Sequence, residues 1–313
     1  MNEMHHAADA AARAGDGPDL FVVTAATSDT GSAVVRALLD GGSPVVAVGR
    51  DGDRLQEYAR LGARTRVSAL DDAEGLAAAL EGATGAFVMM APGLIPVSED
   101  FPAYQHAVTV AQASAVEAAH RRGSLRRVVT LSGWAANYPG ARGPVGGAEE
   151  VRGRRRRQRG AGGPPAGGLL HGEPPGRHRG RQGHRRHGRP RSPGPSAADD
   201  RHGDIGRVAA EFLRGERPFV PGPVEVVGPA FRTLGEATRL IGAAVGAAGA
   251  RYVSRSPEAV RAALVDAGFS DHMADGTVAM TLDVAEGRIR VLGTERTIST
   301  TTTLEEWVAS ATA

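Results

Sequence analysis

The chain contains neither cysteine nor lysine, and it has few aromatic residues. Without cysteine it can form no disulfide framework and no thiolate nucleophile, which suits a cytoplasmic protein. All 37 basic residues are arginines, so a mechanism that needs a lysine ammonium group is excluded. Aromatic residues make up 4% of the chain, and we therefore expect a core built mainly from alanine, valine and leucine.

Long apolar runs are also absent. No stretch reaches the roughly 20 apolar residues that a membrane-spanning helix needs, and the first 18 residues lack the continuous apolar core of a signal peptide. We expect these residues to form a flexible tail, and we expect no membrane partner. The length of 313 residues and the 41% hydrophobic content fit a globular protein with one large domain or two modest ones.

Positive charge is concentrated in one segment. Residues 151–200 contain thirteen arginines and three acidic residues, a net charge of +10, whereas the whole chain carries +2. The rest of the chain therefore carries −8 and is acidic. A nucleic-acid-binding protein would distribute its basic face over a folded domain, so this pattern does not predict a specific nucleic-acid partner.

Outside that segment, short apolar runs alternate with amphipathic stretches. The alternation predicts a doubly wound parallel α/β sheet of the Rossmann type, with a smaller C-terminal α/β region on the substrate side. The expected strands are 20–25, 44–48, 63–70, 85–91, 126–133 and 223–228. The expected helices are 30–42, 53–62, 73–82, roughly 100–122, 203–215, 233–246 and 256–268, with Asp204 and Ser256 as N-caps.

The turn after the first expected strand reads TAATSDTG, residues 24–31. Dinucleotide-binding folds use glycines here, because main-chain N–H groups at the start of the helix must approach the pyrophosphate. The pattern of one branch is T-G-x-x-G-x-x-G, and only its last glycine is present. An ordinary turn with Thr30 as N-cap is the alternative, but the position in a βαβαβ run favours a cofactor. The expected cofactor-binding residues are Thr24, Ala25, Thr27, Ser28, Asp29, Thr30 and Gly31.

Arg50 follows the second expected strand, where NAD-preferring folds often have an acid and NADP-preferring folds a base. Its guanidinium group could hold a 2′-phosphate bidentately, although a solvated arginine beside Asp51 fits the sequence equally well. We therefore expect NADP(H) rather than NAD(H) as the cofactor. The fourth strand leads to the same carboxyl edge of the sheet, and Met90, Ala91 and Pro92, at its end and just after it, are expected to contact the cofactor.

Several stretches together resemble the NmrA-like family, whose members are atypical short-chain dehydrogenase/reductase proteins with an NAD(P)-binding Rossmann fold. They are TAATSDTGSAVVRALL, VMMAP, RRVVTLSG, GDIGRVAAEFL and the terminal TTTTLEEWV. The resemblance covers roughly residues 20–150 and 203–310, and it rests on the order of the motifs. The chain departs from the family pattern where Ala25 and Ser28 replace glycines and where Ala69 replaces an aspartate.

The resemblance implies two kinds of function. Some members of the family are NAD(P)H-dependent reductases of quinones and other small carbonyl or aromatic compounds, which implies a small-molecule substrate. Others are catalytically silent redox-sensing regulators that bind the cofactor and associate with a protein partner.

The catalytic candidates are Ser132 and Tyr138. Short-chain dehydrogenases of the usual type use a Tyr-x-x-x-Lys pair, which a chain without lysine lacks. Tyr138 and Arg142 have that spacing, but Pro139 and Gly140 between them favour a loop, and arginine stays protonated. Ser132 ends the fifth expected strand, where it would face the nicotinamide and either bind the substrate or cap the loop.

Residues 151–202 lie where the family pattern predicts a helix end, a sixth strand and a substrate-lining segment. They are dominated by Arg, Gly, Pro and Ala, the residues whose codons prevail when a GC-rich gene is read out of frame. We interpret the segment as a frame-shifted translation without regular buried structure, which would leave the literal protein unstable or inactive. An RGG-like nucleic-acid arm and a flexible insert are the alternatives. We expect no metal site at its histidines, which are His171, His178, His184 and His187.

The sequence thus predicts four parts. Residues 1–18 form the tail, and residues 19–150 form an NAD(P)-binding Rossmann domain. Residues 151–202 form the Arg/Gly/Pro-rich irregular segment. Residues 203–313 complete the Rossmann core and add the substrate-side region.

Overall fold

The structure is a computed structural model that describes residues 19–89, 101–133, 166–172, 199–219, 222–230, 232–289 and 294–312. In these ranges eight parallel strands form one sheet in the order β3-β2-β1-β4-β5-β6-β7-β8. Their bounds are β1 Phe21–Val23, β2 Val45–Gly49, β3 Arg64–Val67, β4 Gly85–Val88, β5 Arg127–Ser132, β6 Ala166–Gly172, β7 Gly222–Val227 and β8 Thr297–Ser299. The expected doubly wound parallel sheet is confirmed.

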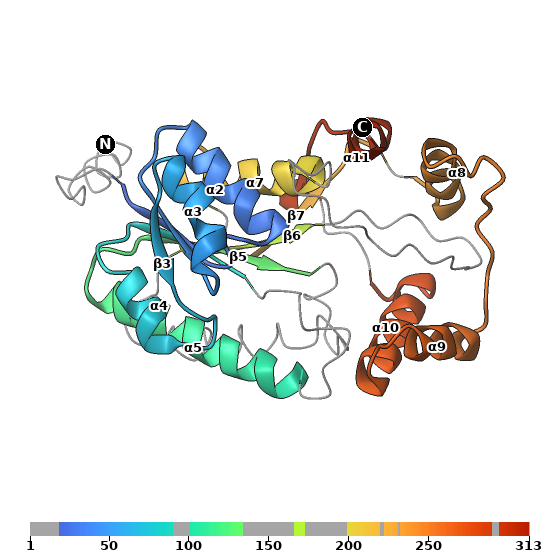
Figure 1. Cartoon of the computed structure of the whole chain (residues 1–313), viewed down its shortest axis with the longest axis horizontal. Helices are drawn as coiled ribbons and strands as arrows, with labels where there is room; N and C mark the ends of the chain where they lie inside the picture. Colours follow the sequence, from blue (N-terminus) through green and yellow to red (C-terminus); the bar gives the residue numbers. More distant parts are fainter. Residues whose placement is uncertain are drawn as a thin grey trace, which may run out of the picture.

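Helices cover both faces of this sheet (Figure 1). On one face lie α2 (Asp29–Asp40), α3 (Gly52–Arg60) and α7 (Asp199–Arg214), and on the other lie α4 (Ala73–Ala79) and α5 (Phe101–Arg121). Successive strand residues point to opposite faces, so Phe21 and Val23 pack in the first layer while Val22 packs in the second. Burial on both faces explains why these strands are continuously apolar.

The order of the strands reverses between β1 and β4. From β1 the chain runs outward to β2 and β3, and it then returns to β4 on the other side of β1. In such sheets ligands bind in the crevice outside the carboxyl ends of the strands at the reversal. The site is therefore expected where the chain leaves β1 and β4.

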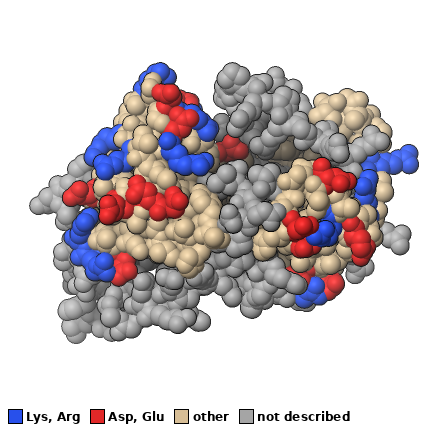
Figure 2. Space-filling view, turned by 60° about the horizontal axis from the view of Figure 1, so that its bottom comes forward, with Lys and Arg blue, Asp and Glu red and all other residues tan. Residues whose placement is uncertain are grey.

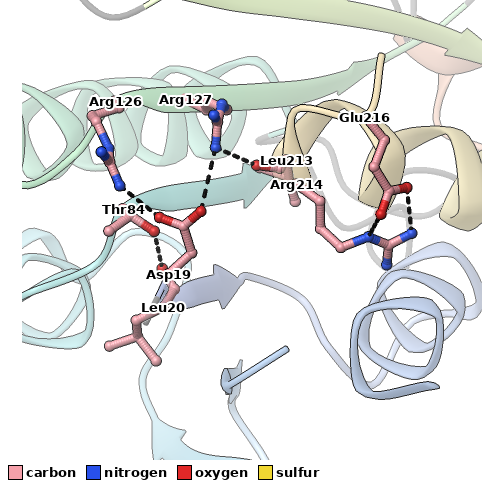
Figure 3. Close-up of polar contacts among 8 residues, drawn as sticks. All are labelled: Asp19, Leu20, Thr84, Arg126, Arg127, Leu213, Arg214 and Glu216. Atoms are coloured by element: carbon pink, nitrogen blue, oxygen red, sulfur yellow. Dashed lines mark hydrogen bonds and ion pairs between the residues drawn. The ribbon is translucent and has the colours of Figure 1, made fainter. Parts of the chain in front are cut away.

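At the opposite, amino edge of the sheet, charged side chains connect distant segments (Figure 3). Arg126 donates a hydrogen bond of 2.6 Å to the Asp19 carboxylate, and the Arg127 guanidinium lies 3.6 Å from the same carboxylate. Arg127 also donates to the main-chain oxygen of Leu213, at 3.0 Å. These contacts connect the start of β5 to the residues before β1 and to the end of α7, so we assign the cluster a structural role.

We expected no regular buried element in residues 151–200, but residues 166–172 form a regular element, the strand β6 between β5 and β7. Leu169 pairs with Thr130 on one side and with Pro223 on the other. The N–H and C=O groups of strands inside a sheet need partners, and pairing between main chains does not require β-branched side chains. Residues 1–18, 151–165 and 173–198 lie outside the described part of the chain.

The helix after this segment also begins earlier than expected. It starts at Asp199 instead of residue 203, so that Asp204 lies inside α7. Asp204 is buried and pairs with Arg207 one turn later, and it is therefore not an N-cap.

The C-terminal region is mainly helical, and it returns to the sheet through β8, which pairs with β7. Its helices are α8 (Leu234–Ala244), α9 (Pro257–Asp266), α10 (Asp271–Ala285) and α11 (Leu304–Thr312), with a short 3-10 turn at Thr294–Arg296. Ser256 caps α9 as expected, by accepting a hydrogen bond from the N–H of Ala259. In Figure 1, α8, α9 and α10 lie to the right of the sheet, on the side away from β3.

On the face seen in Figure 2, acidic and basic side chains are interspersed among the described residues. Arg36 pairs with Glu57, and Arg261 pairs with both Asp271 and Asp275. The face in view therefore presents mixed charge rather than a continuous basic surface. Within the described residues, no helix is both long and apolar enough to cross a membrane.

Candidate cofactor site at the switch point

The turn from β1 into α2 adopts the backbone of a glycine-rich turn although its first glycine is missing. Ala25 has φ +50°, and it is the one residue other than glycine with a positive φ in the described ranges. An L-residue pays about 1–2 kcal/mol in this left-handed region, which glycine occupies without penalty. The first glycine of T-G-x-x-G-x-x-G falls at this position, so the strained backbone accounts for that glycine in the pattern.

Gly31, the glycine that the chain retains, is required by close packing. A Cβ atom built on Gly31 would lie 2.2 Å from the main-chain oxygen of Ala25 and 2.8 Å from its carbonyl carbon. Both neighbours are backbone atoms that cannot move aside. Gly31 therefore lets the start of α2 lie directly against the end of β1, as a dinucleotide-binding turn requires.

Ser28, which replaces the middle glycine, is the N-cap of α2. Its hydroxyl oxygen accepts a hydrogen bond from the Gly31 N–H at 3.1 Å and donates to the Ala25 oxygen at 2.8 Å. The expectation that Thr30 could cap this helix is wrong, because Thr30 is buried as the second residue of α2. Ser28 stands three residues before the Gly31 N–H, the spacing of an N-cap, and was therefore a better cap signal than Thr30.

Thr24 supports the turn from inside the sheet. Its hydroxyl donates to the Phe87 oxygen and accepts from the Met89 N–H, both at 3.3 Å, and the residue is only 1% exposed. Gln112 of α5 in turn donates to the Met89 oxygen at 3.0 Å. These bonds hold the carboxyl ends of β1 and β4 together at the switch point. The Thr24 hydroxyl thus already donates and accepts a hydrogen bond within the protein.

Two arginines lie beside this turn, at the end of β2. Arg50 is exposed directly after the strand, and Asp51 caps α3 by accepting from the N–H groups of Asp53 and Arg54. Arg54 donates to the main-chain oxygen of Thr27 at 2.7 Å. Sequence reasoning missed Arg54, although a second arginine four residues after Arg50 was a usable signal.

Tyr104, near the start of α5, also lies at this edge and was not predicted. Burial raises the pKa of its hydroxyl, and the nearby charges of Arg50 and Asp71 lower and raise that pKa, respectively. Tyr104 packs against the hydrophobic cluster that contains Met89 and Val108. The Tyr104 ring and the Arg50 guanidinium group thus lie near each other, where the start of α5 meets the carboxyl ends of β2 and β3.

Ser132 is the last residue of β5, as expected, and it is partly buried. It pairs in register with His171 of β6, and His171 pairs with Glu225 of β7. Glu225 is only 1% exposed. Sequence reasoning did not single it out, although an acid within the apolar run PVEVVG was a signal. Four further candidates, Met90, Ala91, Pro92 and Tyr138, lie outside the described residues.

The C-terminal region contains a separate cavity of about 640 Å³ at the start of α8. Thr233, Arg239, Arg251 and Tyr252 are among its lining residues, and burial raises the pKa of the Tyr252 hydroxyl. None of its lining residues belongs to the β1–α2 turn. No group of three or more potential metal ligands occurs in the part of the chain that the structure describes.

A turn of this form at the switch point of a doubly wound parallel sheet defines a dinucleotide-binding class of fold. Residues 25–152 match the model of a family described as NAD(P)H-binding. This match and the solved structures that share the fold confirm the NAD(P)-binding Rossmann fold that the resemblance to NmrA-like, atypical short-chain dehydrogenase/reductase proteins implied.

Three of these structures cover the chain almost completely. The triphenylmethane reductase of Citrobacter sp. in complex with NADP(H) has a TM-score of 0.65 and 17% identity, and the alignment covers 94% of this chain and 100% of that one. The NADPH complex of a quinone oxidoreductase from Escherichia coli has a TM-score of 0.63 and 17% identity, with 93% and 98% covered. A nucleoside-diphosphate-sugar epimerase from Staphylococcus aureus has a TM-score of 0.64 and 11% identity, with 93% and 99% covered. No curated protein matches the chain in sequence.

Proposed function

We propose that the protein is an NAD(P)H-dependent oxidoreductase that reduces a small quinone, carbonyl or aromatic compound. The observation that carries this proposal is the β1–α2 turn, in which Ala25 keeps a left-handed backbone and Gly31 admits no side chain. The family match over residues 25–152 supports it. Among the structural neighbours are a triphenylmethane reductase with NADP(H) and a quinone oxidoreductase with NADPH, which favours a reductase.

The residues of the turn fit a dinucleotide. The first main-chain N–H groups of α2 would face its pyrophosphate, and Met90, Ala91 and Pro92 would border it from the β4 side. Arg50, with Arg54 behind it, would contact a 2′-phosphate, which favours NADP(H) over NAD(H). The bound cofactor would supply a hydride from its nicotinamide ring.

Ser132 would orient the substrate at the end of β5, with Tyr138 as the second catalytic candidate. A chain without lysine cannot lower the pKa of a tyrosine by the usual tyrosine–lysine arrangement. For this reason a second function is kept, a redox-sensing regulator that binds NAD(P)H without turnover and associates with a protein partner.

Two measurements separate these functions. Calorimetric titration with NADPH and NADH tests binding, and loss of the absorbance of the reduced nicotinamide with a panel of small quinones tests turnover. Binding with turnover supports the reductase, and binding without turnover favours the regulator. If neither cofactor binds, both functions are wrong.

A further inference from the structure

The Ser28 hydroxyl is hydrogen-bonded at the start of α2, the end of the helix that a cofactor phosphate would approach. The first N–H groups of a helix have no partner within the helix, and a bound phosphate uses them. In this chain the N–H of Gly31, the third residue of α2, already donates to the Ser28 oxygen at 3.1 Å. Gly31 is itself buried.

The same hydroxyl also fixes the strained part of the turn. The Ala25 oxygen accepts from both the N–H and the hydroxyl of Ser28, at 2.9 Å and 2.8 Å. The Ser28 oxygen further lies 3.5 Å from the sulfur of Met89, at the end of β4. Ser28 therefore connects the two sides of the switch point and keeps Ala25 at φ +50°.

We propose that Ser28 sets the cofactor affinity of this protein, by stabilising the empty turn with a hydrogen bond that a dinucleotide must displace. This inference rests on the proposed cofactor function and concerns one residue of that site. The negative charge of exposed Asp29, next to Ser28, also lowers the affinity for a dinucleotide, because it repels the phosphates. Stability without cofactor and affinity for cofactor then change in opposite senses when the hydroxyl is removed.

The test compares Ser28→Gly and Ser28→Ala with the natural chain. Both substitutions free the Gly31 N–H, and we expect NADPH to bind roughly tenfold more tightly, the equivalent of one hydrogen bond to a charged group. The melting temperature without cofactor should fall by a few degrees, because the helix loses its cap. Ser256→Ala, which removes the N-cap of α9 outside the β1–α2 turn, is the matched control. It should lower the melting temperature by a similar amount and leave the affinity for NADPH unchanged.

The outcomes separate this inference from the proposed function. If the natural chain binds NADPH and the folded Ser28 variants bind it equally or less tightly, the role of Ser28 is wrong and the cofactor function stands. If only the Ser28 variants bind NADPH, the inference is supported, whereas the proposed function of the natural chain fails. If no variant binds any dinucleotide, both are wrong.

Discussion

At the scale of single residues, the departures from the glycine pattern did not abolish the turn. Ala25 takes the backbone conformation of the glycine that it replaces, and Ser28 replaces the other glycine at a φ of −83°, which any residue adopts. The sequence predicted the position of this turn between β1 and α2, whereas the cofactor-binding roles of its residues stay predictions. It could not predict the left-handed Ala25, which belongs to the close approach of α2 to the end of β1. It missed the Ser28 cap, although a serine three residues before Gly31 was a signal.

Arg50 provides a prediction about the choice of cofactor. Arg50→Gln should weaken NADPH binding roughly tenfold and leave NADH binding unchanged, because only NADPH carries the 2′-phosphate that a guanidinium group can hold. Arg60→Gln, on an exposed arginine in the last turn of α3, is the matched control. Calorimetric titration with both cofactors measures the effect. An equal loss for NADPH and NADH would rule out the assigned role of Arg50.

At the scale of elements, α2 and α7 pack with almost no space between their backbones. A Cβ on Gly206 of α7 would lie 2.6 Å from the carbonyl carbon of Ala33 and 2.8 Å from its oxygen, whereas a Cβ on Gly203 of the same helix would meet nothing within 4 Å. The two glycines therefore have different structural roles. Gly206 permits the helix crossing, and Gly203 only lowers the helix propensity.

This difference predicts opposite effects of the same substitution. Gly206→Ala should lower the free energy of unfolding by about 1–3 kcal/mol, because the added methyl forces the helices apart. Gly203→Ala should raise it by up to about 1 kcal/mol through helix propensity. Urea denaturation of both variants measures the effect. Equal changes of the same sign would contradict the close crossing.

The caps of the C-terminal helices predict a dependence of stability on pH. The main-chain N–H and then the hydroxyl of Thr233 hold the pKa of Glu236 below its ordinary value of 4.5, and Thr303 lowers the pKa of Glu306 in the same way. Since these pKa values are lower in the folded state, the stabilisation is present above pH 4.5 and is lost as the pH falls through the lowered pKa.

Glu236→Gln keeps a capping side chain but removes the charge that titrates. The fall in melting temperature on acidification below pH 4.5 should therefore be smaller in Glu236→Gln than in the natural chain. Glu81→Gln, at a position that caps no helix, serves as the control for the loss of one charge. An unchanged acid response in Glu236→Gln would show that this cap does not contribute.

Elements were predictable where hydrophobic spacing was regular, and they were missed where it was not. Most of the first five strands are short, continuously apolar runs, and the helices between them carry a period of 3.6 residues. α10 was missed because its buried positions include Gly276 and Asp283, which interrupt an apolar stripe. β6 was missed because its sequence, AGGLLHG, has no β-branched residue. That strand is positioned by its pairing with β5 and β7, so its own sequence does not reveal it.

At the scale of the whole molecule, β6 makes the sheet continuous. β5 and β7 pair with it on its two sides, so that among the described strands β7 and β8 are joined to the rest of the sheet through residues 166–172. Main-chain pairing of this kind is compatible with the interpretation of 151–202 as a frame-shifted translation, since it needs little from the side chains. The nucleotide sequence tests that hypothesis directly. An alternative frame across 151–202 should restore a helix and an apolar strand, whereas stop codons or equally arginine-rich products in both other frames would exclude it.

Whether this chain forms the continuous sheet can be tested on the protein itself. The amides of residues 166–172 should exchange with solvent as slowly as those of β7, because their hydrogen bonds lie inside the sheet. Leu170→Pro removes one N–H from the ladder and should cost about 1–3 kcal/mol of the free energy of unfolding. Leu170→Val, which retains the N–H, is the control and should change stability much less. If the amides exchange freely and the proline variant melts like the natural chain, the sheet ends at β5. The two halves of the fold then lack the strand that joins them, as the composition of 151–200 predicted.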